Sequence, residues 1–293
     1  MMRVVHEGAG LGARIEGLDL ARTLEVADFR AILRALGDYG VLCFPRQALE
    51  PDALAAFGAH FGALEINVAN RFHAPGLPEV MILSNMEENG RAIGFADAGQ
   101  DWHTDLSYSA EIALATMLHA KRVPVRDGRP LGDTQFRDMH RAWADLPAAM
   151  KARIDGLEAV HDFAKFWDMM RARPGSARKP LSPRQREERP PVRQPLVRVH
   201  PITGKKVLYC NPGYAVRIAG LEENESGALL DTLFRHQAQD KYLYAHRWSE
   251  GDVLMWDDIG TTHNAVADYG PDEPRFMYRV QMLATLDYAR LVA

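Results

Sequence analysis

The sequence predicts a mainly β protein, a sandwich or barrel of short strands, with a few helices. Two observations support this class. From Pro195 onward, short runs rich in β-branched and aromatic residues alternate with turn residues, as in sandwiches and barrels. Amphipathic helical patterns are few and lie apart along the chain. Of the 293 residues, 47% are hydrophobic and 25% charged, which is ordinary for a globular chain. We expect one domain over residues 1–293.

Helices are expected where apolar residues recur at intervals of three and four. Phe29, Ile32, Leu33 and Leu36 follow this pattern, and Gly40 ends the run. The other expected helices are a stretch through Leu54, Phe57 and Phe61, then Met150–Leu157, and Glu222 to about His236.

Strands are expected in short apolar runs that turn residues separate. Such runs are too short to be told from buried helices by period alone, so their length and flanking residues decide. The expected strands are Val41–Pro45, Val80–Leu83, Ala113–Leu118, Leu196–Val199, Lys206–Cys210, Ala215–Ile218, Tyr242–Trp248, Asp252–Trp256 and Phe276–Ala284.

Residues 173–193 differ in composition from the rest, with five prolines and many Arg and Lys. One interpretation is a solvated, mobile surface loop. The other is a lid that orders over the active site when a ligand binds, because long loops of this kind often act as lids. The sequence leaves both open.

Composition also limits the partners. The net charge of −4 gives no reason to expect nucleic acid or an anionic membrane surface. No run approaches the roughly 20 apolar residues that span a bilayer, and the N-terminus lacks a signal-peptide pattern. The only cysteines, Cys43 and Cys210, lie in apolar runs and are expected to be buried, reduced thiols. We therefore expect a cytoplasmic protein.

The most informative motif is His103-Thr104-Asp105 together with His263 far downstream. In an extended strand, residues two apart point to the same side, so His103 and Asp105 could share one face. A second imidazole from His263 would complete a set of two His and one carboxylate. This set leaves coordination positions open and suits non-haem Fe(II) in oxygen-activating enzymes.

The chain resembles the 2-oxoglutarate-dependent dioxygenases of the taurine dioxygenase and chlorophenoxyacetate dioxygenase family. The matching motifs occur in the family's order from the early strands to near the C-terminus. They are Trp102–Asp105, Gly132–Thr134, His161–Phe163, His200–Gly204, Glu250–Asp258 and the stretch from His263 to Arg279.

The resemblance implies a double-stranded β-helix, which is a jelly-roll, cupin-like fold, with flanking helices packed outside it. It implies that His103, Asp105 and His263 bind Fe(II) and form the catalytic centre. The co-substrates would be 2-oxoglutarate and O2, and the enzyme would hydroxylate a small organic anion while releasing succinate and CO2. Such an anion would be a sulfonate, carboxylate, sulfate or aryloxy acid. Family members commonly self-associate, so the resemblance also allows a homo-oligomer.

Further roles follow from matching positions. Arg275 and Thr134 correspond to the residues that bind the far carboxylate of 2-oxoglutarate, and a guanidinium suits this task because its planar fork binds carboxylate bidentately. Arg279 corresponds to the arginine that binds the acidic group of the primary substrate. Aromatic walls of the substrate pocket are expected from Tyr108, Phe163 and Tyr214. By contrast, Trp102 and Trp256 are expected to pack, and His161 and His200 to be structural or to support the metal ligands.

Three positions depart from the family pattern. Gly99 stands where taurine enzymes carry Asn, which makes taurine doubtful as the substrate. Asp258 replaces a common Asn and is expected to pair with a cation or to be solvated. Gln194 stands where His is frequent.

Two other functions remain open at this point. A zinc hydrolase could use the same three ligands, because zinc accepts two His and a carboxylate with one open position. That mechanism has no evident use for Arg275 and Thr134. A cupin-like binding protein without activity is the other alternative, although an intact triad argues against it.

Overall fold

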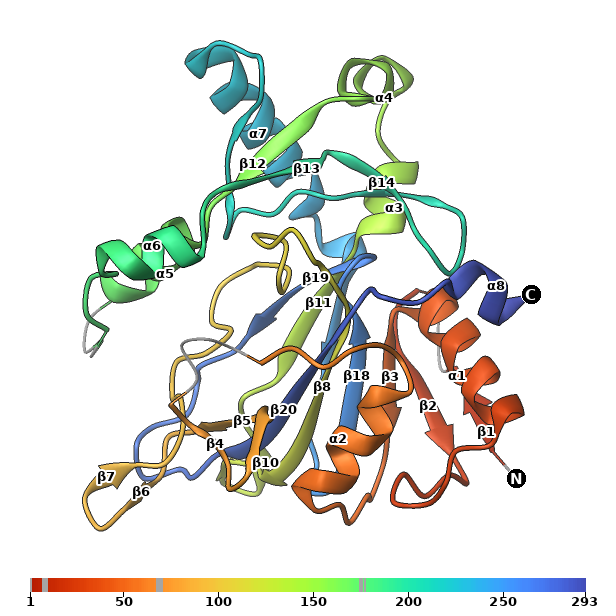
Figure 1. Cartoon of the computed structure of the whole chain (residues 1–293), viewed down its shortest axis with the longest axis vertical. Helices are drawn as coiled ribbons and strands as arrows, with labels where there is room; N and C mark the ends of the chain where they lie inside the picture. Colours follow the sequence, from red (N-terminus) through yellow and green to blue (C-terminus); the bar gives the residue numbers. More distant parts are fainter. Residues whose placement is uncertain (1, 7–9, 67–70, 174–175, 177) are drawn as a thin grey trace.

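Two β-sheets pack face to face and form the frame of the protein (Figure 1). The computed structural model describes residues 2–6, 10–66, 71–173, 176 and 178–293. In spatial order, the strands of the large sheet are β1 (Arg3–Val5), β2 (Ala13–Glu16), β3 (Val41–Phe44), β18 (Val253–Asp257), β8 (Ala113–Arg122), β20 (Phe276–Leu283), β5 (Leu77–Ser84) and β4 (His73–Ala74).

The smaller sheet consists of β17 (Leu243–His246), β11 (Thr134–Asp138) and β19 (Thr261–Ala265), in that order. The pairs within both sheets are antiparallel except β2 with β3. Side chains alternate between the faces of a strand. In β8, Leu118 therefore lies between the sheets, whereas Met117 faces the helices outside. This arrangement is the expected jelly roll.

Helices α1 (Val26–Tyr39), α2 (Pro51–Ala59) and α8 (Tyr288–Val292) pack at the outer face of the large sheet (Figure 1). The apolar stripe of α1 is buried there, as its sequence period predicts, and Ile32, Leu33 and Leu36 are inaccessible to solvent. Gly40 ends the helix in the left-handed region at φ 65°, and its N–H donates to Leu36 O at 2.8 Å.

A second hydrophobic cluster lies in the part of the chain that follows β11. It is built by α4 (Ala148–Ile154), α7 (Glu223–Gln237) and the short sheet β13–β12–β16 (Val192–Pro195, Glu158–His161 and Ala215–Ile218). The remaining elements are α3 (Met139–Ala144), the 3-10 helix Asp240–Tyr242, and the hairpins β14–β15 (Val197–Val199, Lys206–Leu208), β6–β7 (Glu87–Glu88, Arg91–Ala92) and β9–β10 (Val125–Arg126, Arg129–Pro130).

The segment 173–193 follows helix α5 (Phe163–Arg171) and is more regular than a simple loop. It contains helix α6 (Pro183–Glu188), which begins at a capping box between Ser182 and Gln185, and the first residues of β13. Residues 174, 175 and 177 of this segment lie outside the described residues. That the segment acts as a lid stays a prediction.

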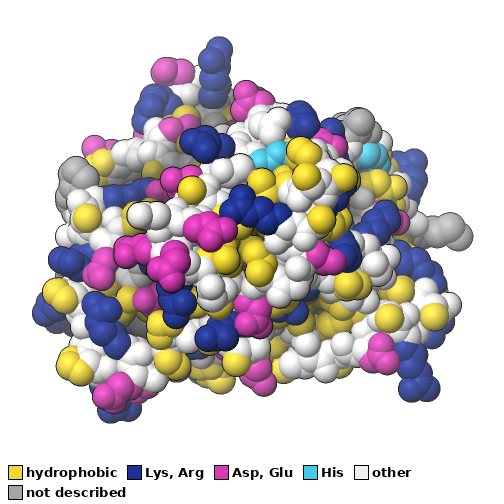
Figure 2. All heavy atoms as spheres, turned by 90° about the horizontal axis from the view of Figure 1, so that it is seen from above, with side chains coloured by type: hydrophobic (Ala, Val, Ile, Leu, Met, Phe, Trp, Pro, Cys, Tyr) yellow, Lys and Arg dark blue, Asp and Glu magenta, His cyan; other side chains and the backbone are white. Residues whose placement is uncertain are grey.

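The surface carries mixed charge. On the face shown in Figure 2, Lys and Arg side chains lie among Asp and Glu side chains rather than in a field of one sign. Among the described residues, no helix is both long enough and apolar enough to cross a membrane.

Candidate metal centre and active site

His103, Asp105 and His263 come together at one end of the space between the sheets. His103 and His263 form an isolated antiparallel bridge, in which His103 N donates to His263 O at 3.0 Å and His263 N donates to His103 O at 2.8 Å. His263 belongs to β19, but His103 and Asp105 lie in a turn-rich loop and not in a strand. The expected extended strand is therefore wrong here, yet both side chains still point to the same place.

The donor atoms of the three residues lie within 4.8 Å of one another. His103 Nε2 is 3.4 Å from Asp105 Oδ1, and His263 Nε2 is 3.8 Å from Asp105 Oδ2. His103 Nδ1 lies 2.8 Å from Asp101 O, and a carbonyl can only accept, so Nδ1 carries the hydrogen. The neutral ring then presents the lone pair of Nε2 to a carboxylate oxygen. Two acceptors that face each other in a buried site fit a metal cation.

The electrostatics keep His263 and Asp105 in the forms that bind metal. Burial lowers the pKa of His263 to about 3, assisted by the charges of His103 and Arg279. Burial by itself would raise the pKa of Asp105. The neighbouring rings of His103 and His263 and the charge of Arg279 outweigh that effect and hold the pKa below its ordinary value. The site therefore offers neutral imidazoles and a carboxylate.

A buried polar network supports the carboxylate ligand. Thr116 Oγ1 lies 3.1 Å from Asp105 Oδ2 and 2.7 Å from Asp258 Oδ2, and it accepts from Gln281 Nε2 at 3.3 Å. Asp258 is fully buried, and its pKa is raised by burial and by the charge of Asp105. A protonated Asp258 donates to Thr116, which frees the Thr116 hydrogen for Asp105. Such hydrogen bonds fix the orientation of a metal-binding carboxylate.

Asp258 thus corrects both sequence expectations for this position, since it is neither solvated nor paired with a cation. Its Oδ1 accepts from Trp256 Nε1 at 3.0 Å. Trp256 therefore packs, as expected, and also positions Asp258.

One cavity extends from the triad to Thr134 and Arg275. Trp248 Nε1 donates to Thr134 Oγ1 at 3.0 Å, which leaves the Thr134 hydrogen free to donate into the cavity. Arg275 is 5% exposed, and its Nε has no hydrogen-bond partner among the described residues. Burial lowers its pKa, yet a guanidinium remains charged at neutral pH. A buried cation beside a hydroxyl donor is suited to a carboxylate.

A second cavity opens on the other side of the triad. Arg279 lines both cavities, and its Nε has no hydrogen-bond partner among the described residues. The wall is largely aromatic and includes all three aromatic residues expected from the sequence. Its aromatic residues are Phe95, Tyr108, Phe163, Phe166, Trp167 and Tyr214.

Sequence reasoning missed Phe166, Trp167 and Arg178 in this wall. The first two lie three and four residues after Phe163 on α5, and this helical spacing could have indicated them. No sequence signal indicates Arg178, whose guanidinium donates to Asp97 at 2.7 and 2.8 Å and lies 4.8 Å from the ring of Trp167.

Two glycines shape the site. A Cβ on Gly213 would lie 2.9 Å from His103 Cβ, so only glycine allows the backbone to pass this close to the metal ligand. Gly99 lines both cavities with φ +76°, a conformation that Gly and Asn tolerate. Glycine in place of the family Asn therefore allows the same backbone conformation but leaves the cavity without a polar side chain at this position.

The other histidines and Trp102 line neither cavity. His161 stacks on Tyr209, and His200 Nε2 lies 3.0 Å from Asp257 Oδ2 in a separate buried cluster. The guanidinium of Arg137 lies 3.7 Å from the ring of Trp102. Gln194 is buried, and its amide donates to Ser109 O at 2.8 Å.

Residues 5–281 match the sequence model of the family described as taurine catabolism dioxygenase TauD, TfdA family. The chain belongs to the TauD/TfdA family. It is 34% identical over 261 residues to the alpha-ketoglutarate-dependent 2,4-dichlorophenoxyacetate dioxygenase of Cupriavidus pinatubonensis, which covers 86% of this chain and 87% of the relative.

Solved structures of TauD/TfdA-like enzymes agree. A taurine dioxygenase from Burkholderia xenovorans has a TM-score of 0.75 and 30% identity, covering 96% of this chain and 90% of that one. The structure of AAD-2 in complex with Mn(II) and N-oxalylglycine has a TM-score of 0.79 and 26% identity, covering 98% of each chain. These likenesses confirm the jelly roll.

This TauD/TfdA chain is therefore an alpha-ketoglutarate-dependent dioxygenase that uses 2-oxoglutarate, O2 and a metal. The zinc hydrolase finds no support, and the binding protein without activity is wrong because the chain is an enzyme.

Proposed function

We propose that this enzyme uses Fe(II), held by His103, Asp105 and His263, to hydroxylate a small organic anion. One observation carries the choice of an anion. Arg279 lines an aromatic cavity next to the triad, and its Nε has no hydrogen-bond partner among the described residues. This Nε atom is buried, and a guanidinium that lines an aromatic cavity in this way suits an anionic ligand, because it donates charge-assisted hydrogen bonds.

Each side chain has a distinct task. A ferrous ion at the triad would supply the redox chemistry that couples O2 and 2-oxoglutarate to hydroxylation. Arg275 and Thr134 bind the far carboxylate of 2-oxoglutarate and fix its direction. Arg279 binds the acidic group of the substrate, and Tyr108, Phe163 and Tyr214 enclose its body and exclude water. The hydroxyls of Tyr108 and Tyr214 stay protonated, because burial raises the pKa of both.

The cavity favours an apolar or aromatic body over taurine. Six aromatic side chains line it, and Gly99 contributes no amide to the wall. The relative in Cupriavidus is named for an aryloxy acid, and this lining suits that substrate class. We infer no nucleic-acid or membrane partner.

An anaerobic binding screen tests the proposal. The Fe(II) and 2-oxoglutarate complex of such enzymes has a visible absorption band that responds to substrate near the metal. Aryloxy acids, sulfonates, carboxylates and sulfates should shift this band, whereas the uncharged amide of the same acid should not. Arg279→Ala should keep the band and lose its shift by substrate. Equal shifts with acid and amide would refute the assignment of Arg279.

The choice of iron is tested separately. The metal-free enzyme, reconstituted in turn with Fe(II), Mn(II) and Zn(II), should form succinate in the presence of O2 only with Fe(II). Equal succinate formation with either of the other ions would contradict the assignment.

A further inference from the structure

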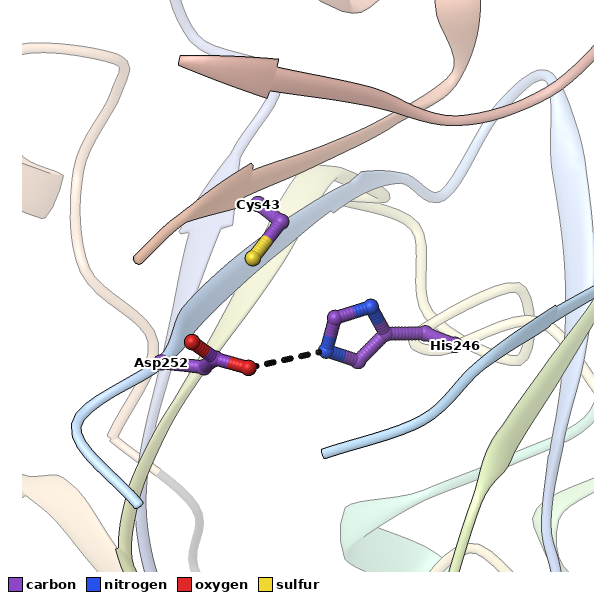
Figure 3. Close-up of side chains that lie close together, drawn as sticks. All are labelled: Cys43, His246 and Asp252. Atoms are coloured by element: carbon purple, nitrogen blue, oxygen red, sulfur yellow. Dashed lines mark ion pairs between the residues drawn. The ribbon is translucent and has the colours of Figure 1, made fainter. Parts of the chain in front are cut away.

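A second group of potential metal ligands lies away from the triad. It consists of Cys43 in β3, His246 at the end of β17 and Asp252 in the turn before β18 (Figure 3). The donor atoms lie within 4.8 Å of one another, and His246 Nε2 is 3.5 Å from Asp252 Oδ2. Figure 3 shows the sulfur of Cys43 directed toward the space between the other two side chains. Two parts of the chain that are far apart in sequence thus bring a thiol, an imidazole and a carboxylate to one point.

These groups are buried, and not all of their polar atoms have hydrogen-bond partners among the described residues. All three residues are less than 10% exposed, at 6%, 7% and 6% in the order given. The Nε2 atom of His246 has no hydrogen-bond partner among the described residues, although it faces the carboxylate. Polar atoms that are buried without a partner are costly, so such an atom calls for an explanation. A cation between the three donors would satisfy all of them at once.

We propose that Cys43, His246 and Asp252 form a second metal site, separate from the catalytic one, for zinc or a similar borderline-soft divalent ion. Thiolate and imidazole donors select such ions over Mg²⁺ and Ca²⁺, which prefer oxygen alone. Three protein ligands leave one tetrahedral position for water. Asp252 Oδ2 accepts from Ser249 N at 2.9 Å, which fixes the carboxylate as supporting hydrogen bonds do in metal sites.

The charge balance agrees with a divalent ion. Burial, together with the charge of Asp252, raises the pKa of Cys43 to about 12, so the thiol is neutral in the metal-free protein. A coordinating thiol loses its proton. The occupied site would then hold a thiolate, a carboxylate and a neutral imidazole, and two negative charges balance the ion.

A third cluster, His140 with His200 and Asp257, does not carry the same inference. His200 Nδ1 accepts from the backbone N–H of Ile202 and Thr203, each at 3.3 Å. The neutral ring therefore carries its hydrogen on Nε2, the atom that faces Asp257, and has no lone pair there for a metal.

The proposed site also lies beside the 2-oxoglutarate cavity. His246 is the cross-strand neighbour of Thr134, and its ring lies edge-on to Trp248 at 4.8 Å. Trp248 in turn donates to Thr134. A bound ion would tie β17 to β3 and β18, and so would hold the strand that supports these side chains.

Cobalt titration of the metal-free enzyme tests the proposal. A thiolate bound to Co(II) gives an intense near-ultraviolet charge-transfer band, and the catalytic triad contains no sulfur. The wild-type enzyme should bind two Co(II) ions per chain and show this band. His103→Ala should keep the band, because only the catalytic site is damaged. Cys43→Ser should lose the band and bind one ion.

Cys210→Ser is the matched control. Cys210 is also buried, its pKa is likewise raised to about 12, and it belongs to none of the three clusters. This variant should keep both ions and the band. Asp252→Asn should keep the band at saturating Co(II) but weaken its binding about tenfold or more, since a ligand charge is lost.

Zinc at about 100 times its dissociation constant should raise the Tm of the His103→Ala variant by about 5 °C, and the same addition to the His103→Ala/Cys43→Ser variant should not. Absence of the band in the folded wild-type enzyme would overturn the proposal, as would its persistence in Cys43→Ser. Neither outcome depends on dioxygenase activity.

Discussion

Replacement of Arg275 by lysine isolates what the guanidinium fork contributes to 2-oxoglutarate binding. Arg275 is 5% exposed and its Nε lacks a hydrogen-bond partner among the described residues, so its charge and this N–H group are available to a ligand. Lysine keeps the charge but offers a point donor in place of a fork. Loss of one charge-assisted hydrogen bond costs about 1.5–3 kcal/mol. The Kd of 2-oxoglutarate should therefore rise about 10- to 150-fold.

Anaerobic titration of the Fe(II) enzyme with 2-oxoglutarate, followed by the visible band, measures this Kd. The Fe(II) affinity measured without 2-oxoglutarate should be unchanged, which separates carboxylate binding from damage to the triad. Arg279→Lys is the matched control and should leave the Kd of 2-oxoglutarate within about threefold while weakening the primary substrate. A change below about threefold in Arg275→Lys, or equal changes in both variants, would refute the assignment.

Other residues give further predictions. Asp258→Asn should change the free energy of unfolding at neutral pH by less than about 1 kcal/mol. The variant should become more stable relative to the wild type as pH rises, because the raised pKa of Asp258 means that the folded state holds a proton which the unfolded chain releases. Asp257→Asn should lower the free energy of unfolding by about 1.5–3 kcal/mol, because it removes a buried carboxylate that faces the N–H of His200 and whose pKa is held low against burial. Urea unfolding of both variants distinguishes the two, and equal losses would contradict a protonated Asp258. Burial lowers the pKa of His161 from 6.5 to about 3, so its contribution to stability is present above pH 6.5 and is lost as pH falls toward 3. Between pH 7 and pH 5, the free energy of unfolding of His161→Phe should therefore fall by about 2 kcal/mol less than that of the wild type. Urea unfolding of the metal-free proteins measures this difference, and parallel pH profiles would refute it. Limited proteolysis within 173–193 should slow when 2-oxoglutarate and substrate are bound, and unchanged cleavage would argue against a lid.

The sequence predicts the larger elements well because their patterns are strong. The apolar stripe of α1 and the strand Ala215–Ile218 lie where their periods place them. The expected strand at Tyr242–Trp248 instead begins with a 3-10 turn, and only Leu243–His246 pair with β11. Short helices such as α3 and α6 were missed, because six residues span too few turns to show a period.

In the site, too, some residues can be predicted from the sequence and others cannot. Metal ligands and arginines stand in motifs, so their identity can be read locally even though His103 lies in a loop. The network around Thr116 cannot be predicted in this way, because its members come together only in the fold. Thr116 lies on β8, Gln281 lies on β20, and Asp258 follows β18. The environment of Asp258 reverses its expected chemistry, since burial beside another carboxylate favours the protonated form.

The reciprocal backbone hydrogen bonds between His103 and His263 bear on how the enzyme gains and loses its metal. These bonds depend on main-chain atoms alone, so protonation of the rings or departure of the ion leaves them in place. The two imidazoles are consequently preassembled, and metal exchange requires side-chain adjustment rather than refolding of the loop. Chelation should therefore empty the catalytic site reversibly, and added ferrous ion should restore it without a slow folding step.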